Sequence, residues 1–222
     1  MIRAVLFDLD GTLADTAPDL AYALNLLRTA RGLLPLSVTY LRQFASMGAR
    51  GLINAGFNLD PDDEEFGPLS DEFHTLYEAN LCRETRLFSG MPQVLDWLEA
   101  NGLAWGIVTN KIERYTLPLV RQLGLHPRAR TVVSGNTAMR AKPHPDPLLY
   151  ASRECAVAPE ACLYVGDDER DVRAARAAGM RVAVARYGYL GVGRPPEAWG
   201  ADALIDFPTD LVRYLLGLRP VG

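Results

Sequence analysis

Short, continuous apolar runs alternate with segments of helical spacing along most of the chain. The first run, residues 4–9, is bounded by a turn, which is typical of a buried parallel strand. Strand–helix alternation predicts an α/β fold with a Rossmann-like parallel sheet and right-handed crossovers. Further strands are expected at 104–108, 131–133, 162–165, 182–185 and 203–205, and helices at 91–100, 114–123, 146–154, 171–178 and 209–218.

The pattern changes after Pro18, where several segments have helical spacing and no strand is expected up to about residue 84. One helix covers residues 19–28, a second follows a cap at Ser37, a third covers 51–57, and a fourth contains Phe73. We therefore expect a small all-helical cap domain, residues 17–86, inserted after the first strand. The α/β core domain would consist of residues 1–16 and 87–222.

Composition limits the classes of partner and compartment. The chain of 222 residues is 49% hydrophobic and 23% charged, with a net charge of −4, so no basic surface for a nucleic acid is expected. No apolar run is long enough to span a membrane, and the first residues do not fit a secretory signal. Three cysteines without CxxC spacing favour free thiols in a reducing cytoplasm. A monomer or weak dimer is the default expectation.

Two carboxylates leave the first strand together, in the sequence Asp8-Leu9-Asp10-Gly11-Thr12. Like charges a few ångströms apart repel by about 4 kcal/mol at an effective dielectric constant near 20. A divalent cation, or a proton on one carboxylate, relieves this repulsion. The pair suggests a metal-assisted site in which one Asp attacks and the other moves a proton. The alternative is an Asp-Gly turn that caps the following helix.

Further polar clusters follow other predicted strands. They are Thr109 with Asn110, the group Asp167, Asp168 and Asp171, and, in a loop before a helix, Lys142 with Pro143. Ligands of open α/β sheets bind outside the carboxyl ends of the strands. We therefore expect these residues to converge on one site.

The set Asp-x-Asp-Gly-Thr, hydrophobic-Thr-Asn, Lys-Pro and Gly-Asp-Asp-x-x-Asp resembles the haloacid dehalogenase (HAD) superfamily along essentially the whole chain. The stretches 8–16, 108–111 and 142–147 resemble its phosphatase branch, and within it the phosphoglycolate phosphatase group. The stretches 166–171, 187–189 and 199–202 are similar to the N-acetylmuramic acid 6-phosphate phosphatases of that group.

This resemblance implies a Mg²⁺-dependent phosphomonoesterase that works through an aspartyl-phosphate. Asp8 would be the nucleophile and Asp10 the general acid and base. Asp8, the backbone carbonyl of Asp10 and Asp167 would hold the Mg²⁺. Asp168 and Asp171 would orient metal-bound waters, and the residues leave open which matters more and whether Asp171 is only a helix N-terminal charge.

Substrate contacts are expected from both parts of the chain. Thr109, Asn110 and the fixed charge of Lys142 would hold the phosphoryl group, and the residues leave open whether Lys111 faces the site or solvent. In the cap, Arg50 of the loop 46–51 would clamp a substrate carboxylate. 2-Phosphoglycolate and N-acetylmuramic acid 6-phosphate both carry one, so the substrate is left open between them.

Other interpretations stay in view. A sugar phosphomutase of the same superfamily would keep both aspartates of the first motif. A non-enzymatic phospho-acceptor module, resembling a two-component receiver, also gathers aspartates, a threonine and a lysine at strand ends. In the cap, Tyr22, Phe44 and Tyr77 are interpreted as core residues rather than a sugar-stacking surface. Cap closure is expected about hinges near residues 16–18 and 88–90.

Overall fold

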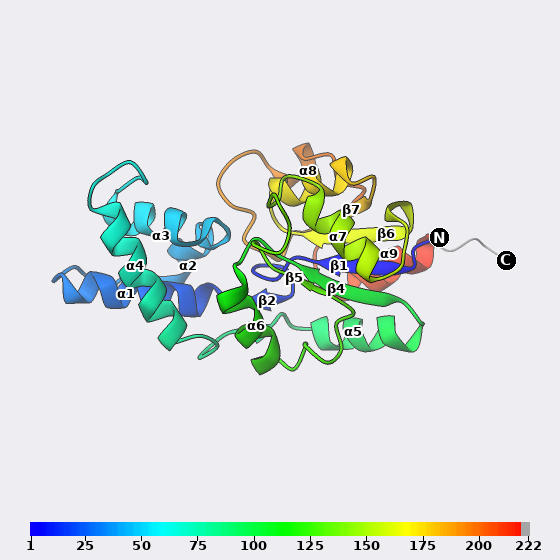
Figure 1. Ribbon diagram of the computed structural model, residues 1–222, viewed down its shortest axis with the longest axis horizontal. Coiled ribbons are helices and arrows are strands. Elements are labelled where there is room, and N and C mark those ends of the chain that lie inside the picture. The colour runs from blue at the N-terminus through cyan, green and yellow to red at the C-terminus, as the bar shows by residue number, and fades with distance from the viewer. Residues whose placement is uncertain (219–222) are drawn as a thin grey trace.

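The computed structural model, in which residues 1–218 are described, is built on a six-stranded sheet (Figure 1). The strand order is β5-β4-β1-β6-β7-β8, and every neighbouring pair is parallel, so the expected α/β fold is confirmed. The strands are β1 (Ala4–Phe7), β4 (Ala104–Val108), β5 (Val132–Val133), β6 (Cys162–Gly166), β7 (Arg181–Ala185) and β8 (Ala203–Ile205).

The first strand is shorter than its apolar run, because Leu9 belongs to the turn that follows. Its carbonyl accepts hydrogen bonds from the amides of Leu13 and Ala14, at 3.1 and 2.9 Å, instead of joining the sheet. β1 lies between β4 and β6, and its residues from Ala4 to Phe7 are fully buried. Asp8 therefore leaves the most enclosed strand of the sheet.

Helices cover both faces of the sheet. Val5 and Phe7 of β1 pack in one apolar cluster with α5 (Met91–Ala100), α6 (Glu113–Gln122) and α9 (Asp210–Gly217). Ala4 and Leu6 point to the other face, in a cluster with α7 (Asp146–Glu154) and α8 (Glu169–Ala177). Alternate residues of a strand face opposite sides, so burial on both sides explains the continuous apolar runs.

The segment between β1 and α5 is helical, apart from a short ribbon at its two ends. Its helices are α1 (Ala17–Ala30), α2 (Val38–Arg42), α3 (Gly48–Phe57) and α4 (Phe66–Ala79), which gather at one end of the molecule (Figure 1). They share a separate apolar cluster that includes Leu24, Leu52 and Phe73. We refer to these helices as the cap; the domain boundaries at residues 17 and 86 stay a prediction.

Two details of this region were not expected from the sequence. β2 (Ala14–Asp15) and β3 (Arg86–Leu87) pair antiparallel where the chain enters and leaves the cap. Strands of two residues are too short to show a periodic pattern, so sequence reading misses them. Tyr22 was interpreted as cap core, which is wrong: it is 38% exposed, and its ring lies beneath the guanidinium of Arg83.

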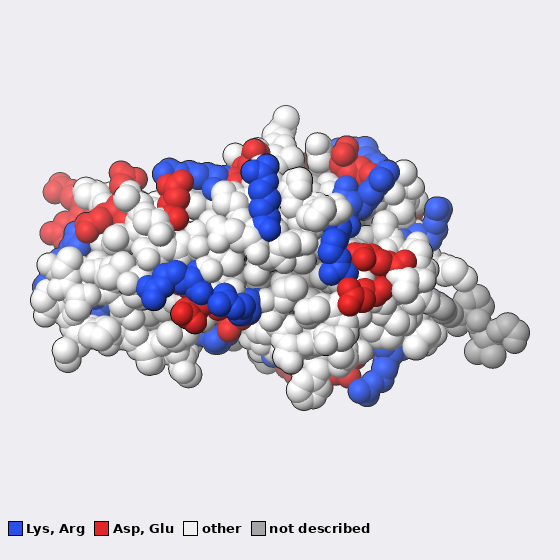
Figure 2. Space-filling model, turned by 90° about the horizontal axis from the view of Figure 1, so that it is seen from below, with Lys and Arg blue, Asp and Glu red and all other residues white. Residues whose placement is uncertain are grey.

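The surface mixes charges of both signs. On the face drawn in Figure 2, Lys and Arg side chains lie among Asp and Glu side chains, with uncharged surface between them. No helix within residues 1–218 has the length and apolar character needed to cross a bilayer. Cys82, Cys155 and Cys162 are free thiols.

Candidate active site

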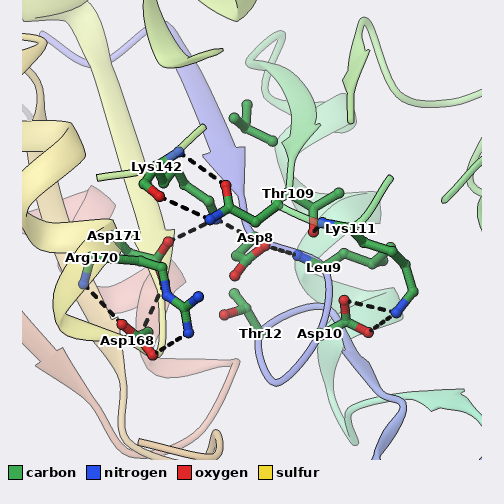
Figure 3. Close-up of polar contacts among 12 residues, drawn as sticks. Asp8, Leu9, Asp10, Thr12, Thr109, Lys111, Lys142, Asp168, Arg170 and Asp171 are labelled. Atoms are coloured by element: carbon green, nitrogen blue, oxygen red, sulfur yellow. Dashed lines mark hydrogen bonds and ion pairs between the residues drawn. The ribbon is translucent and has the colours of Figure 1, made fainter. Parts of the chain in front are cut away.

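The carboxyl ends of the three central strands meet beneath the cap. Asp8 follows β1, Thr109 follows β4 and Asp167 follows β6, and these strands are neighbours in the sheet. Between them and the cap lies a cavity of about 290 Å³. Asp8, Asp10, Thr109, Asn110, Lys111 and Lys142 line it from the core side. The structure thus brings together most residues that the sequence singled out (Figure 3).

Asp8 and Lys142 form the centre of the site. The Lys142 ammonium lies 3.0 Å from Asp8 Oδ1 and 2.7 Å from Asp171 Oδ1, and the Leu9 amide donates to the same Asp8 oxygen at 2.7 Å. Burial raises the pKa of Asp8 to about 6, against the lowering effect of the Lys142 charge. The Lys142 side chain is only 1% exposed, so its charge acts with little screening by water.

Tyr164 is a member of this network that sequence reasoning missed. Lys142 donates to its hydroxyl at 2.7 Å, and the hydroxyl donates to the Val108 carbonyl at 2.8 Å. Tyr164 sits in β6 among apolar residues and is fully buried, so its pattern is that of a core position. Only the fold reveals that the Tyr164 hydroxyl holds the Lys142 ammonium in position.

Asp171 is a helix N-terminal charge that also contacts the site, and its expected role toward metal-bound waters stays a prediction. It stands in the first turn of α8, where its Oδ2 accepts hydrogen bonds from the amides of Asp167 and Asp168, both at 3.1 Å. With Asp168 as N-cap, this makes a capping box. Its other oxygen meets the Lys142 ammonium. A helix-terminal charge and a site residue are therefore the same side chain.

Asp167 is the acid that follows β6. It is fully buried, and it accepts hydrogen bonds from the Thr12 hydroxyl and the Tyr189 amide, both at 2.9 Å. Burial, together with the charges of Asp8 and Asp171, raises its pKa well above the ordinary value. Within residues 1–218 no Lys or Arg forms an ion pair with it, so its charge lacks a protein counter-ion.

A metal ion fits this arrangement. Carboxylate oxygens of Asp8, Asp167 and Asp171 all lie within 4.8 Å of one another, so the three side chains could hold an ion. Oxygen donors of this kind suit a hard divalent cation, whose charge would offset their repulsion. The Asp10 carboxylate does not join this cluster. Its expected ligand is the backbone carbonyl, and that contribution stays a prediction.

Glycines make room for the buried acids. A Cβ on Gly11 would lie 2.2 Å from an Asp167 oxygen, and φ at Gly11 is +80°. A Cβ on Gly188 would lie 2.4 Å from the Asp167 Cβ. The glycine after Asp10 is therefore needed both for the turn and for the approach of Asp167.

The Asp10 carboxylate pairs with the Lys111 ammonium (Figure 3). The Lys111 ammonium contacts both Asp10 oxygens, at 2.9 and 3.1 Å, and the Thr16 hydroxyl donates to Asp10 Oδ1 at 2.5 Å. The Lys111 side chain is 9% exposed. Lys111 therefore faces the site. Its position depends on how the loop after β4 turns, which residue type alone does not reveal.

Thr109 and Asn110 shape the loops around the cavity. The Thr109 hydroxyl accepts a hydrogen bond from the Lys111 amide at 3.1 Å. The Asn110 amide donates to the Lys142 carbonyl at 2.9 Å and accepts from the Lys142 backbone N–H at 3.0 Å. Both polar atoms of the Asn110 side chain are thus used to position Lys142, which was not foreseen for a residue expected to bind phosphate.

The structure does not bring Arg50 to the cavity. Arg50 is exposed in the first turn of α3. Ser46 of the 3-10 helix η1 (Ala45–Met47) and Gly48 at the start of α3 do line the cavity. The buried side of this turn is taken by Gly51 and Leu52, which leaves Arg50 on the outside. The expected carboxylate clamp is therefore not supported by its position.

The arginine that does line the cavity is Arg170. It comes from α8, and it donates to Asp168 Oδ2 at 2.7 Å and to the Ser46 carbonyl of the cap at 2.8 Å. Sequence reasoning missed it because an arginine between acidic residues near a helix N-terminus resembles a solvated helix position.

Comparisons with known proteins agree with this architecture. Residues 5–185 match the family model of the haloacid dehalogenase-like hydrolases. The chain is 40% identical over 214 residues to the N-acetylmuramic acid 6-phosphate phosphatase of Pseudomonas aeruginosa, covering 96% of this chain and 95% of that protein. It is 44% identical over 210 residues to the phosphoglycolate phosphatase of Xanthomonas campestris pv. campestris, covering 94% of each.

A solved structure has the same fold. The crystal structure of a predicted phosphoglycolate phosphatase from Haemophilus somnus superposes with a TM-score of 0.84 at 27% identity, covering 96% of this chain and 98% of that one. These likenesses extend along nearly the whole chain and confirm the resemblance that the motifs carry. The chain belongs to the haloacid dehalogenase-like hydrolase family.

Proposed function

We propose that this phosphoric monoester hydrolase cleaves a small carboxylated phosphate ester through an aspartyl-phosphate on Asp8, with Mg²⁺ as its cofactor. The observation that carries the proposal is the setting of Asp8. Its Oδ1 is held by Lys142 and by the Leu9 amide, and its carboxylate lines the cavity beside Asp10. Oδ2 is then the oxygen that attacks phosphorus.

In the first step, Asp8 Oδ2 forms a bond to phosphorus while the bond to the ester oxygen breaks. Asp10 gives its proton to the departing alkoxide. In the second step, Asp10 takes a proton from water, the water oxygen attacks phosphorus, and Asp8 and inorganic phosphate are released. Proton transfer of this kind contributes about 10²–10⁴ in rate.

Lys142 and Thr109 would stabilise the charge on the phosphoryl oxygens during both steps. The Lys142 ammonium is already fixed by Asp171 and Tyr164, so little reorganisation is needed when charge develops. Thr109 stands at the carboxyl end of β4 and lines the cavity. The Lys111 ammonium is held against Asp10, next to the expected proton transfer.

Asp8, Asp167 and the Asp10 backbone carbonyl would hold the Mg²⁺, with Asp171 and Asp168 placed behind them. When bound, the ion would offset the carboxylate charges and polarise a phosphoryl oxygen. The buried, unpaired Asp167 beside Asp8 supports this assignment.

The first test is hydrolysis of p-nitrophenyl phosphate with Mg²⁺. Asp8→Asn should lower kcat by at least about 10³, because the amide cannot form the acyl-phosphate. Asp62→Asn, the same change at an exposed cap position, should leave kcat unchanged. A stable acyl-phosphate without turnover in the wild-type protein would instead favour a phospho-acceptor module.

The relatives point to two substrates, 2-phosphoglycolate and N-acetylmuramic acid 6-phosphate. Both are phosphate esters with a carboxylate, so the proposal covers both. A panel of phosphate esters compared by kcat/KM would rank them. A mutase would instead release a bisphosphate during turnover, which a rapid-quench experiment detects.

We also propose a cytoplasmic protein that is a monomer or weak dimer. The free thiols of Cys82, Cys155 and Cys162 support a reducing compartment. Cell fractionation and the molar mass in solution by light scattering test these two statements.

A further inference from the structure

The cavity has two unlike walls. The core wall carries the charged groups Asp8, Asp10, Lys111 and Lys142. The cap wall is apolar and aromatic, and it includes Leu20, Phe73, His74 and Tyr77, with Ile112 and Tyr115 of the core beside it. At about 290 Å³ the cavity approaches the range of about 300–1,000 Å³ that is usual for small-molecule sites.

Two polar atoms of the cap wall, His74 Nδ1 and the Tyr77 hydroxyl, make no hydrogen bond of ordinary geometry with the described residues. The Tyr77 hydroxyl still interacts with the nearby Lys111 ammonium, whereas His74 Nδ1 has no such neighbour to bond to among those residues. Tyr77 is 2% exposed, and both residues line the cavity. Buried polar groups in native proteins nearly always have partners, so the unbonded His74 Nδ1 beside the weakly bonded Tyr77 hydroxyl needs an explanation. A ligand in the cavity would provide one.

The positions of these atoms indicate which part of a substrate they would meet. The Lys111 ammonium contacts Asp10 and lies 4.9 Å from the centre of the Tyr77 ring. Asp10 is the acid expected to protonate the leaving-group oxygen. Tyr77 therefore lies on the leaving-group side of the site, with His74 in the preceding turn of α4.

Aromatic packing holds both side chains in place. The His74 ring stacks on Tyr115, with centroids 5.6 Å apart and planes at 11°, and the Tyr77 ring stacks on Phe73. Burial lowers the pKa of His74, which favours the neutral imidazole. Burial raises the pKa of Tyr77 to about 12, so its hydroxyl keeps its proton and can donate. The wall thus offers neutral hydrogen-bonding groups within an apolar surface.

We propose that His74 and Tyr77 determine specificity by binding the polar substituents of a sugar-type leaving group. A pyranose combines hydroxyl or amide groups with apolar C–H faces, and this matches the cap wall. A two-carbon acid has one methylene group and would leave the wall uncovered and His74 Nδ1 without a hydrogen bond. The inference rests on the proposed function and selects a phosphorylated sugar within it.

The test compares three esters with Mg²⁺: N-acetylmuramic acid 6-phosphate, glucose 6-phosphate and 2-phosphoglycolate. Wild type should prefer N-acetylmuramic acid 6-phosphate, which carries both a sugar and a carboxylate, to 2-phosphoglycolate. Glucose 6-phosphate tests the sugar without the carboxylate. Tyr77→Phe and His74→Phe each keep an aromatic ring and remove the polar atoms. Each variant should lower kcat/KM about tenfold on a sugar phosphate whose polar groups the replaced residue binds, mainly by raising KM. On 2-phosphoglycolate the same variants should change kcat/KM less than about twofold.

Tyr22→Phe is the matched control, because it removes a hydroxyl from the cap outside the cavity. It should leave all three kcat/KM values unchanged. The melting temperature separates specificity from a structural role. Without ligand, His74→Phe should melt at or above the wild-type temperature, because an unpaired buried nitrogen is removed.

Equal losses on all esters together with a lowered melting temperature of His74→Phe would mean that these side chains are structural, and would overturn the inference. So would a wild-type preference for 2-phosphoglycolate, or unchanged sugar phosphate kinetics in both variants. Each of these results leaves the proposed function standing. A wild type that hydrolyses no ester at all, p-nitrophenyl phosphate included, overturns the proposed function and the inference with it.

Discussion

Some residues of this site lie where their own burial lowers the stability of the fold. Asp167 is fully buried beside Asp8 and Asp171, and a Lys or Arg counter-ion to it is not found within residues 1–218. An unpaired buried charge destabilises a fold, so a protein that keeps one gives up stability for function. The sequence shows the cluster of aspartates, but their burial is a property of the folded chain.

Asp167→Asn should therefore stabilise the protein when EDTA has removed metal ions. The same substitution should abolish Mg²⁺-dependent activity. The folded state raises the pKa of Asp167, so its protonated form is favoured on folding. The stability that protonated Asp167 contributes is fully present below the unfolded pKa of 3.8. It is lost as the pH rises through the pKa of Asp167 in the folded protein. The introduced amide cannot ionise, so the variant should become increasingly more stable than wild type as the pH rises from about 4 to about 8.

Melting curves in EDTA across this pH range measure the difference, at about 2–4 °C for each kcal/mol in a chain of this size. Adding Mg²⁺ at pH 8 should raise the melting temperature of wild type and leave that of the variant unchanged. A variant that melts below wild type in EDTA at every pH would contradict the idea that Asp167 is an unrelieved charge.

At the scale of elements, strand ends and helix starts position the acids. β6 delivers Asp167, and the capping box of α8 aims Asp171 at both the loop amides and Lys142. A helix N-terminus favours negative charge, so local helix chemistry and site chemistry require the same residue. The tight passage from β6 into α8 depends on Gly166, where a Cβ would lie 2.4 Å from the Asp171 carboxylate.

Gly166→Ala should push Asp171 away and loosen Lys142. We expect a loss of about 1–3 kcal/mol in the free energy of unfolding, as for other overpacked sites, together with a lower kcat. Urea unfolding and steady-state kinetics measure the two effects.

Gly217→Ala is the matched control. Gly217 is an exposed residue of α9, and a Cβ there meets nothing within 4 Å. It should be neutral or stabilising by up to about 1 kcal/mol, without any effect on kcat. Equal stability and kcat for Gly166→Ala and wild type would show that the close approach of Asp171 is dispensable.

At the scale of the whole molecule, the site exists only where the cap meets the core. Arg170 of the core donates to the Ser46 carbonyl of the cap, and the Ser46 hydroxyl lies 3.5 Å from Asp167. A second contact between core and cap is the ion pair of Arg114 in α6 with Glu78 in α4. The contacts of Ser46 hold the loop of residues 46–49, formed by the short 3-10 helix η1 (Ala45–Met47) and the start of α3, over the catalytic groups. A lid that excludes water would require such contacts.

Arg170→Gln should release this loop. A charge-assisted hydrogen bond contributes about 1.5–3 kcal/mol, so amide hydrogen exchange in residues 46–49 should accelerate by about tenfold or more. KM should rise because the closed arrangement is less populated. Hydrogen exchange with mass spectrometry measures the first effect.

Arg176→Gln is its control on the same helix, because Arg176 bonds to Gly200 and Asp202 of the core instead of the cap. It should leave the exchange of the 46–49 loop unchanged. If both variants behave alike, the link between Arg170 and the cap does not govern the loop.

Much of the fold follows from local pattern. Two-sided burial of parallel strands gives continuous apolar runs, and helix caps such as Ser37 mark helix starts, so the parallel sheet and the helical insertion could be predicted from the sequence. The residue types at strand ends also indicated the gathering of Asp8, Thr109 and Asp167, because parallel strands end at one edge. Lys142 was added from a loop that precedes a helix.

The tertiary structure alone decided the partners of each group. Lys111 bonds to Asp10, Asn110 supports the Lys142 backbone, and Tyr164 combines a core position with a bond to Lys142. The tertiary structure also places Arg170, and not Arg50, in the wall of the cavity. The physical reason is that residue type and local spacing fix which chemistry a side chain can offer, whereas distance and burial between remote segments fix what that side chain meets.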